Sequence, residues 1–249
     1  MTFYLVSAVI VFVFSGLLAM AGLGAAFLFV PLFYYMGVPL AEATATALLL
    51  NTVSLLFATV NYWRGHLINW RVGLPVLITA VILSPLGARL TPYVNKTLLL
   101  GLFAAFLVFA GAMMLFYRPQ PRQKPLSRTV EVGAGVGVGS AAGFLGGLLG
   151  VGGGNFILPV LNWLGLETKM AAGTTALIVV FSSFSGFLGH ATLGGLDPFF
   201  ISLMAIMAAT GSIVGSQLMK TKLSNTQLKR IIGILLWLIA AKMIFDLFK

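Results

Sequence analysis

Long apolar segments separated by short polar stretches alternate along the whole chain. Each half contains the same four segments, at about 3–36, 41–63, 71–91 and 96–117, and then at about 131–164, 168–191, 198–219 and 226–248. A spanning helix needs about 20 apolar residues, which the second, third and fourth segments of each half provide. Lipid offers the backbone no hydrogen-bond partner, and continuous apolar runs favour helices over a barrel. The pattern predicts an all-α membrane protein with three transmembrane helices after the first segment of each half.

The first segment of each half is too long for a single span. Its residues, about 34 in number, would form a helix of about 51 Å, whereas the hydrocarbon core is about 30 Å thick. Glycines interrupt both copies, at Gly22 and Gly24 and again from Gly150 to Gly154, and only about a dozen residues follow each interruption. We therefore expect a broken, re-entrant helical hairpin, in which the chain turns at the glycines and leaves by the side it entered.

The two halves repeat each other at a constant offset. Gly22-Leu-Gly-Ala-Ala-Phe-Leu-Phe-Val-Pro31 recurs 128 residues later as Gly150-Val-Gly-Gly-Gly-Asn-Phe-Ile-Leu-Pro159. A duplication with a glycine-broken segment in each copy is typical of secondary transporters and marks their binding site. We expect a first transmembrane repeat at 1–117, a basic cytoplasmic linker at 118–130 and a second transmembrane repeat at 131–249.

Composition excludes several classes of protein. The chain is 59% hydrophobic and 8% charged, whereas soluble domains carry about 25% charged residues, so the outer surface must face a lipid bilayer. The net charge of +10 could indicate nucleic-acid binding, but the basic residues fall between apolar segments, as cytoplasmic loops require. Cysteine is absent and only His66 and His190 are present, so we expect no cofactor and no metal site.

The distribution of basic residues tests the hairpins. If every segment crosses the membrane once, the two sides receive 8 and 7 basic residues; if both first segments are hairpins, they receive 11 and 4. Only the second split has the bias of a cytoplasmic side. A hairpin in the second half alone also gives 11 and 4, so the choice between these two depends on the internal repeat. Two matching hairpins predict inverted repeats with both termini outside.

The smaller group in that split is the predicted periplasmic one. It contains Arg89, Lys96, Lys242 and Lys249. The larger, cytoplasmic group contains Arg64, Arg71, Arg118, Arg122, Lys124, Arg128, Lys169, Lys220, Lys222, Lys229 and Arg230.

The short helix after each break is a candidate anion site. Its first N–H groups have no intrahelical partner, and the helix dipole adds positive potential there. The backbone candidates are Gly22 and Gly24 in the first copy and Gly152, Gly153 and Gly154 in the second. Asn155 adds a side-chain amide, whereas the first copy has Phe27 at that position. The alternative is that the glycines only allow helices to pack closely.

Hydroxyl and amide side chains near the start of the second segments extend this candidate site. They are Thr44, Thr46 and Asn51 in the first half and Thr174, Thr175 and Ser182 in the second. Helical spacing places several of them on one face. The alternative is that each hydroxyl bonds its own helix or a neighbouring one. Arg89 at the membrane edge is expected to snorkel, and a role for the two histidines stays open.

Enzyme chemistry has no support in the sequence. The five acidic residues are scattered, and none is paired along the chain. The glycines before Asn155 are not followed by the Gly-Lys-Ser/Thr of a phosphate-binding loop. We therefore expect the protein not to be an enzyme.

The motif from Gly150 to Pro159, its weaker echo from Gly22 to Pro31, and the Leu-Gly-Gly-Leu stretch before Asp197 resemble the sulfite exporter TauE/SafE family of bacterial membrane transporters. The resemblance covers essentially the whole chain. It implies movement of small sulfur-containing anions such as sulfite or organosulfonates across a bacterial cell inner membrane. The first copy departs from the family motif, because Ala25 and Ala26 replace the usual glycines.

These observations predict a secondary transporter of small anions that works by alternating access of two inverted repeats. The alternatives are an anion channel and a membrane accessory protein without cargo. Protons are a candidate coupling ion. The particular anion, the direction of transport and the oligomeric state stay open.

Overall fold

We describe the protein from a computed structural model, which covers residues 2–19, 22–117, 127–190, 198–218 and 225–247. All the regular structure in these ranges is helical. In chain order, the elements are α1 (Thr2–Ala19), α2 (Ala26–Tyr35), α3 (Leu40–Arg64), α4 (Trp70–Leu90), a 3-10 turn (Thr91–Tyr93), α5 (Lys96–Phe116), α6 (Arg128–Leu149), α7 (Gly154–Trp163), α8 (Thr168–His190), α9 (Pro198–Leu218) and α10 (Asn225–Leu247).

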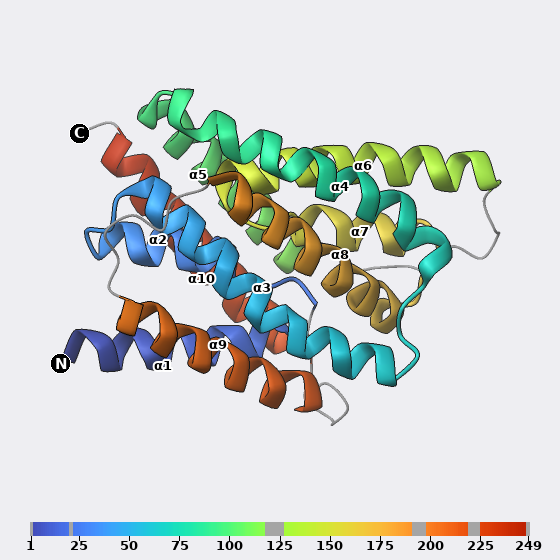
Figure 1. Ribbon diagram of the computed structural model, residues 1–249, viewed down its shortest axis with the longest axis horizontal. Helices are drawn as coiled ribbons and strands as arrows, with labels where there is room; N and C mark the ends of the chain where they lie inside the picture. The colour runs from blue at the N-terminus through green and yellow to red at the C-terminus, as the bar shows by residue number, and fades with distance from the viewer. Residues whose placement is uncertain (1, 20–21, 118–126, 191–197, 219–224, 248–249) are drawn as a thin grey trace.

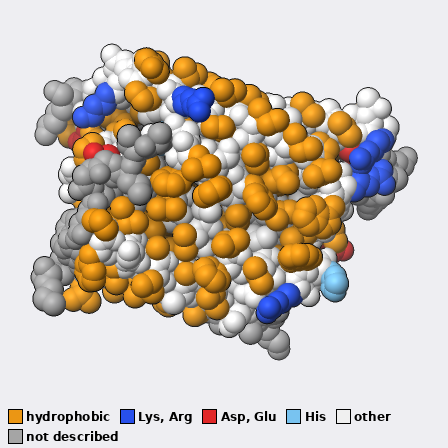
Figure 2. Space-filling view, in the orientation of Figure 1, with side chains coloured by type: hydrophobic (Ala, Val, Ile, Leu, Met, Phe, Trp, Pro, Cys, Tyr) orange, Lys and Arg blue, Asp and Glu red, His pale blue; other side chains and the backbone are white. Residues whose placement is uncertain are grey.

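These helices confirm the predicted all-α class. Among the described residues, α3, α4, α5, α6, α8 and α9 are long and apolar enough to cross a membrane. Hydrophobic side chains spread across the middle of the face in Figure 2, and the charged and histidine side chains lie along its margins. A molecule with that surface is a multi-pass membrane protein. The linker expected at 118–130 falls mostly on 118–126, which lie outside the described residues, and Arg128 already begins α6.

Corresponding helices of the two halves make corresponding contacts. α3 and α8 pack against each other and are the most buried spans. α1 packs on α9 as α6 packs on α4, α3 packs on α9 as α8 packs on α4, and α5 packs on α10. Exchanging the two halves therefore turns α1–α9 into α6–α4 and α3–α9 into α8–α4, and leaves α3–α8 and α5–α10 unchanged.

Matched side chains repeat this exchange in detail. Ser84 in α4 donates to the Ser182 carbonyl at 2.7 Å. Ser212 in α9, 128 residues later, donates to the carbonyl of Ser54, which is the counterpart of Ser182. The two long-range bonds are the same bond made once by each half.

The helices of the two halves run in opposite directions in the view of Figure 1. There α1, α3 and α9 run from left to right, and α6, α8 and α4 run from right to left. α1 begins and α10 ends at the same end of the molecule. Each first-half helix of the pairs α1/α6, α3/α8 and α4/α9 thus opposes its counterpart.

Candidate functional site

Two helix breaks occupy the positions that the glycines predict. α1 ends at Ala19 and α2 begins at Ala26, and α6 ends at Leu149 and α7 begins at Gly154. The backbone in the breaks is left-handed: φ is 67° at Gly22, 73° at Gly24, 71° at Gly150, and 74° at both Gly152 and Gly153. Side chains rarely adopt this conformation, so glycine is needed for each turn. The short helices that follow end at Tyr35 and Trp163, as the sequence predicts.

The breaks lie against each other and against the helices of the opposite half. Gly22 packs on the backbone of Ala172 in α8, and Gly150 packs on Thr44 in α3, which is the counterpart of Ala172. A Cβ on Gly154 would lie 2.6 Å from the Leu23 carbonyl oxygen. The absence of side chains therefore lets the two turns meet in the interior.

A side chain from the end of the second segment holds the helix before each break. The Tyr62 hydroxyl donates to the carbonyl of Ala19 at the end of α1. Its counterpart, His190, places Nε2 3.1 Å from the carbonyl oxygen of Gly147 in the last turn of α6. A carbonyl only accepts, so Nε2 carries the hydrogen. This equivalence gives His190 a structural task that sequence reasoning missed.

Asn51 connects the two breaks. Its Oδ1 accepts from the backbone N–H groups of Ala25 at 2.8 Å and Ala26 at 3.3 Å, the first groups of α2. Its Nδ2 donates to the Ser183 hydroxyl in α8 at 2.9 Å. A Cβ on Gly152 would lie 2.6 Å from the same Nδ2. The amide of Asn51 is fully buried and caps the first of the two short helices.

The second short helix has no such cap. The position that matches Asn51 is Val179, which has no acceptor. The hydrogen bonds of the described residues include none donated by the N–H groups of Gly153 or Gly154, the counterparts of Ala25 and Ala26. Gly153 is left-handed, whereas Ala25 has φ −109° and ψ 3°. The half-sites thus differ in backbone as well as in side chains.

Three of the predicted site residues carry buried polar atoms without a partner in the described structure. They are Asn155 Nδ2, Thr46 Oγ1 and Thr175 Oγ1, on residues that are 3% exposed or less. A buried polar atom left unpaired costs about 1–3 kcal/mol. The same condition holds for side-chain atoms of Ser15, Ser54, Thr59 and Asn162. Asn155 differs from these because it lies in the first turn of α7, beside the uncapped amides.

The other predicted hydroxyls have partners within the protein. Thr44 Oγ1 donates to the Leu40 carbonyl at 2.7 Å, and Ser182 Oγ donates to the Val179 carbonyl at 3.4 Å, both within their own helices. Thr174 Oγ1 accepts from the N–H of Asn69, at the start of α4, at 2.9 Å. These three residues remain candidates through position rather than through free hydrogen-bonding groups.

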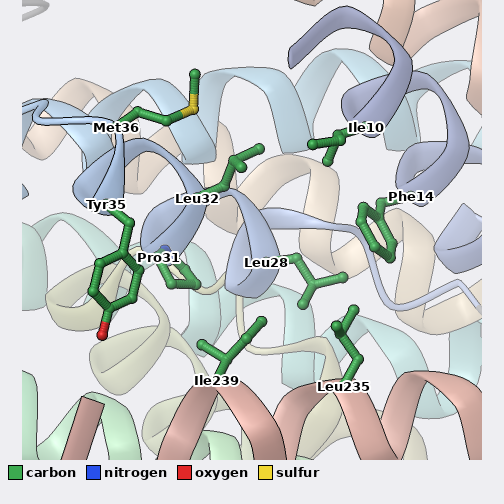
Figure 3. A pocket seen from close by; sticks show the side chains of 9 residues that line it. All are labelled: Ile10, Phe14, Leu28, Pro31, Leu32, Tyr35, Met36, Leu235 and Ile239. Atoms are coloured by element: carbon green, nitrogen blue, oxygen red, sulfur yellow. The ribbon is translucent and has the colours of Figure 1, made fainter. Parts of the chain in front are cut away.

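An open pocket lies elsewhere, between α1, α2 and α10. Its volume is about 300 Å³, and Figure 3 shows hydrocarbon side chains such as Phe14, Leu28 and Leu235 around it. The Tyr35 hydroxyl at its edge already donates to Asp246 at 3.0 Å. A lining of this kind suits apolar groups and offers little to a small anion.

The known proteins that the chain resembles in sequence include membrane transporters. The profile of the family described as sulfite exporter TauE/SafE matches residues 7–243. The probable membrane transporter proteins YunE and YdhB of Bacillus subtilis are 24% and 28% identical to the chain; they align with 82% and 78% of it and with 81% of their own lengths. Sulfite exporter TauE/SafE family protein 1 of Arabidopsis thaliana is 34% identical over 32% of the chain and 18% of its own length. No solved structure matches the chain.

Proposed function

Because the chain belongs to the sulfite exporter TauE/SafE family of membrane transporters, we propose that it is a secondary transporter of a small anion bound at the α7 break. The observation that carries this proposal is the uncapped start of α7. The Gly153 and Gly154 N–H groups and the unpartnered Asn155 Nδ2 are donors in one buried turn. The helix dipole adds positive potential at the same point. Donors without acceptors call for a ligand that only accepts, which is the chemistry of an oxyanion.

The proposed substrate is a sulfur-containing anion, either sulfite or an organosulfonate, moved out of the cell. The family description and the name of the plant relative support sulfite. The broken segments contain no basic residue, so backbone and amide dipoles replace a cationic side chain. Thr46 and Thr175, whose hydroxyls have no partner in the described structure, are proposed as further donors.

Alternating access of two inverted repeats is the proposed mechanism. The opposite helix directions in Figure 1 and the exchangeable contacts between halves support inversion. Asn51, Asn155, Thr46 and Thr175 are 0–3% exposed, and a buried site favours gated access over the open path of a channel. The halves would rock against each other to expose the site to one side at a time. A proton gradient is the proposed driving force.

Topology is testable because the sequence contains no cysteine. The proposal places both termini in the periplasm of a bacterial inner membrane. It therefore predicts that a single cysteine at His66, in the α3–α4 turn, reacts only from the cytoplasm. A single cysteine at Tyr93, which is 86% exposed, reacts only from the periplasm. Labelling of both from one side would contradict the proposed crossing of the membrane by α4.

Flux in proteoliposomes tests the function itself. Purified protein is expected to carry sulfite with saturation, and an imposed proton gradient is expected to raise the rate. A linear, non-saturating current would identify the protein as a channel. No flux of sulfite, methanesulfonate, thiosulfate, sulfate or acetate would support an accessory protein without cargo and would end the transporter proposal.

A further inference from the structure

We propose that Asn51 is a built-in occupant of the first half-site, so that the protein holds one anion per cycle, at the α7 break alone. This inference rests on the proposed function and names the stoichiometry of that site. The duplication supplies two short helices with the same orientation relative to their own half. Two such helix starts could in principle hold two anions, and the contacts around each decide which remains available.

The first half-site is already filled. Asn51 Oδ1 lies 2.8 Å and 3.3 Å from two consecutive backbone nitrogens, Ala25 and Ala26. One oxygen of a bound oxyanion would take this same place. Phe27 fills the position that the second copy gives to Asn155, and its ring meets that of Phe106 edge-on with centroids 6.5 Å apart. The Asn51 oxygen thus takes the N–H groups of Ala25 and Ala26, and an aromatic ring stands where the second copy has a side-chain donor.

The second half-site has the opposite pair of residues. Val179 stands where Asn51 would be, and Asn155 stands where Phe27 would be. Val179 is fully buried, and its Cγ1 would lie 3.1 Å from a Cβ on Gly152. Hydrocarbon at this point cannot accept from the Gly153 and Gly154 amides. The acceptor must therefore come from outside the protein, and Asn155 Nδ2 supplies an additional donor to it.

The two residue differences between the copies, Asn51/Val179 and Phe27/Asn155, act together. The acceptor is internal in one copy and absent in the other, and the side-chain donor is absent in the first copy and present in the second. Asn51 Nδ2 also donates to Ser183 of α8 at 2.9 Å, so the internal occupant is attached to the half that holds the anion. Asn51 is accordingly a positioning residue, which does not itself touch cargo.

The decisive variant is Val179→Asn, which installs in the second copy the cap that the first copy has. Its amide oxygen is expected to accept from Gly153 and Gly154 and to displace the anion. We expect sulfite binding by the purified protein to weaken at least tenfold, with an unchanged or higher melting temperature. Val179→Leu is the matched control, because leucine resembles asparagine in shape and has no acceptor. Equal loss of binding in both variants would show that the larger side chain alone weakens binding, and it would overturn the proposal.

A ligand-free measurement keeps the inference independent of the cargo. Hydrogen exchange of the 150–158 peptide in wild-type protein is expected to be faster than that of the 22–30 peptide, and Val179→Asn is expected to slow it. Unchanged exchange in the variant would overturn the proposed cap even if no anion is found. Normal sulfite binding by Val179→Asn would also overturn it while leaving transport intact. Failure of wild-type protein to bind or move any anion would instead remove the proposed function.

A double exchange tests the stoichiometry directly. Asn51→Val with Phe27→Asn transfers the second copy's pair to the first. Wild-type protein is expected to bind one sulfite per chain by calorimetry, and the double variant two. Two sites in wild-type protein would contradict the inference.

Discussion

The close packing of the second break on Asn51 and Ser183 can be tested by adding a methyl group at Gly152. Gly152→Ala adds a Cβ where φ is 74°, which costs about 1–2 kcal/mol for a residue with a side chain. The new carbon would also lie 2.6 Å from Asn51 Nδ2 and 2.8 Å from Ser183 Oγ, so one or both must move. Overpacking of this kind costs about 1–3 kcal/mol, and loss of the Asn51–Ser183 bond costs about 1 kcal/mol.

Gly37→Ala is the matched control for backbone strain. Gly37, in the α2–α3 turn, has φ 90°, and a Cβ there would meet nothing within 4 Å. Its substitution should cost only the left-handed penalty, about 1–2 kcal/mol. The difference between the variants, at least about 2 kcal/mol by this reasoning, isolates the contact with Asn51 and Ser183.

Thermal unfolding in detergent measures that difference. For a chain of this size 1 kcal/mol corresponds to about 2–4 °C in Tm, so Gly152→Ala should melt about 4–8 °C below Gly37→Ala. Sulfite binding should fall in Gly152→Ala only, because the added side chain changes the turn that presents the Gly153 and Gly154 amides. Equal melting temperatures in the two variants would refute the packing of the second break on Asn51.

Substitutions at Asn155 and at His190, each with a control variant, separate function from structure. Asn155→Leu should weaken sulfite binding about tenfold to a hundredfold without loss of stability, because it removes a hydrogen bond to a charged group. Asn162→Leu is the control, because Asn162 lies at the other end of α7 and also has an unpartnered atom, and it should leave binding unchanged. A similar loss of binding in both variants would remove Asn155 from the site. His190→Tyr, which copies its counterpart Tyr62, should preserve the bond to Gly147 and the pH dependence of flux, whereas His190→Phe should lower stability by about 1 kcal/mol. Loss of proton-driven flux in the tyrosine variant, with folding intact, would give His190 a role in proton transfer instead.

Several features of the fold could be predicted without coordinates because each depends on local sequence. Apolar runs of spanning length set the helices. The overlong first segments required breaks, and left-handed backbone at Gly22 and Gly150 explains why glycine stands there. The first copy has Ala25 where the second has Gly153, which also predicted that the two half-sites differ.

The candidate site was harder to predict because its contacts join residues far apart in the chain. The sequence placed Asn51 among the residues that contact cargo, and in the structure its oxygen caps α2 and its nitrogen donates to Ser183 in the other half. The mismatch between Asn51 and Val179 at the repeat offset was visible in the sequence. Its meaning depended on knowing that position 51 lies beside the first amides of α2.

The sequence by itself determined that this is a duplicated, helical membrane protein with a glycine turn inside each half. Hydrophobic length and glycine backbone freedom act over a few residues, so they can be read directly along the chain. Only the tertiary structure decided that the turns meet, that Tyr62 and His190 hold the helices before them, and that one turn is capped while the other is not. The number of acceptors at a buried helix start depends on which distant side chain packs there, and a linear pattern does not contain that choice.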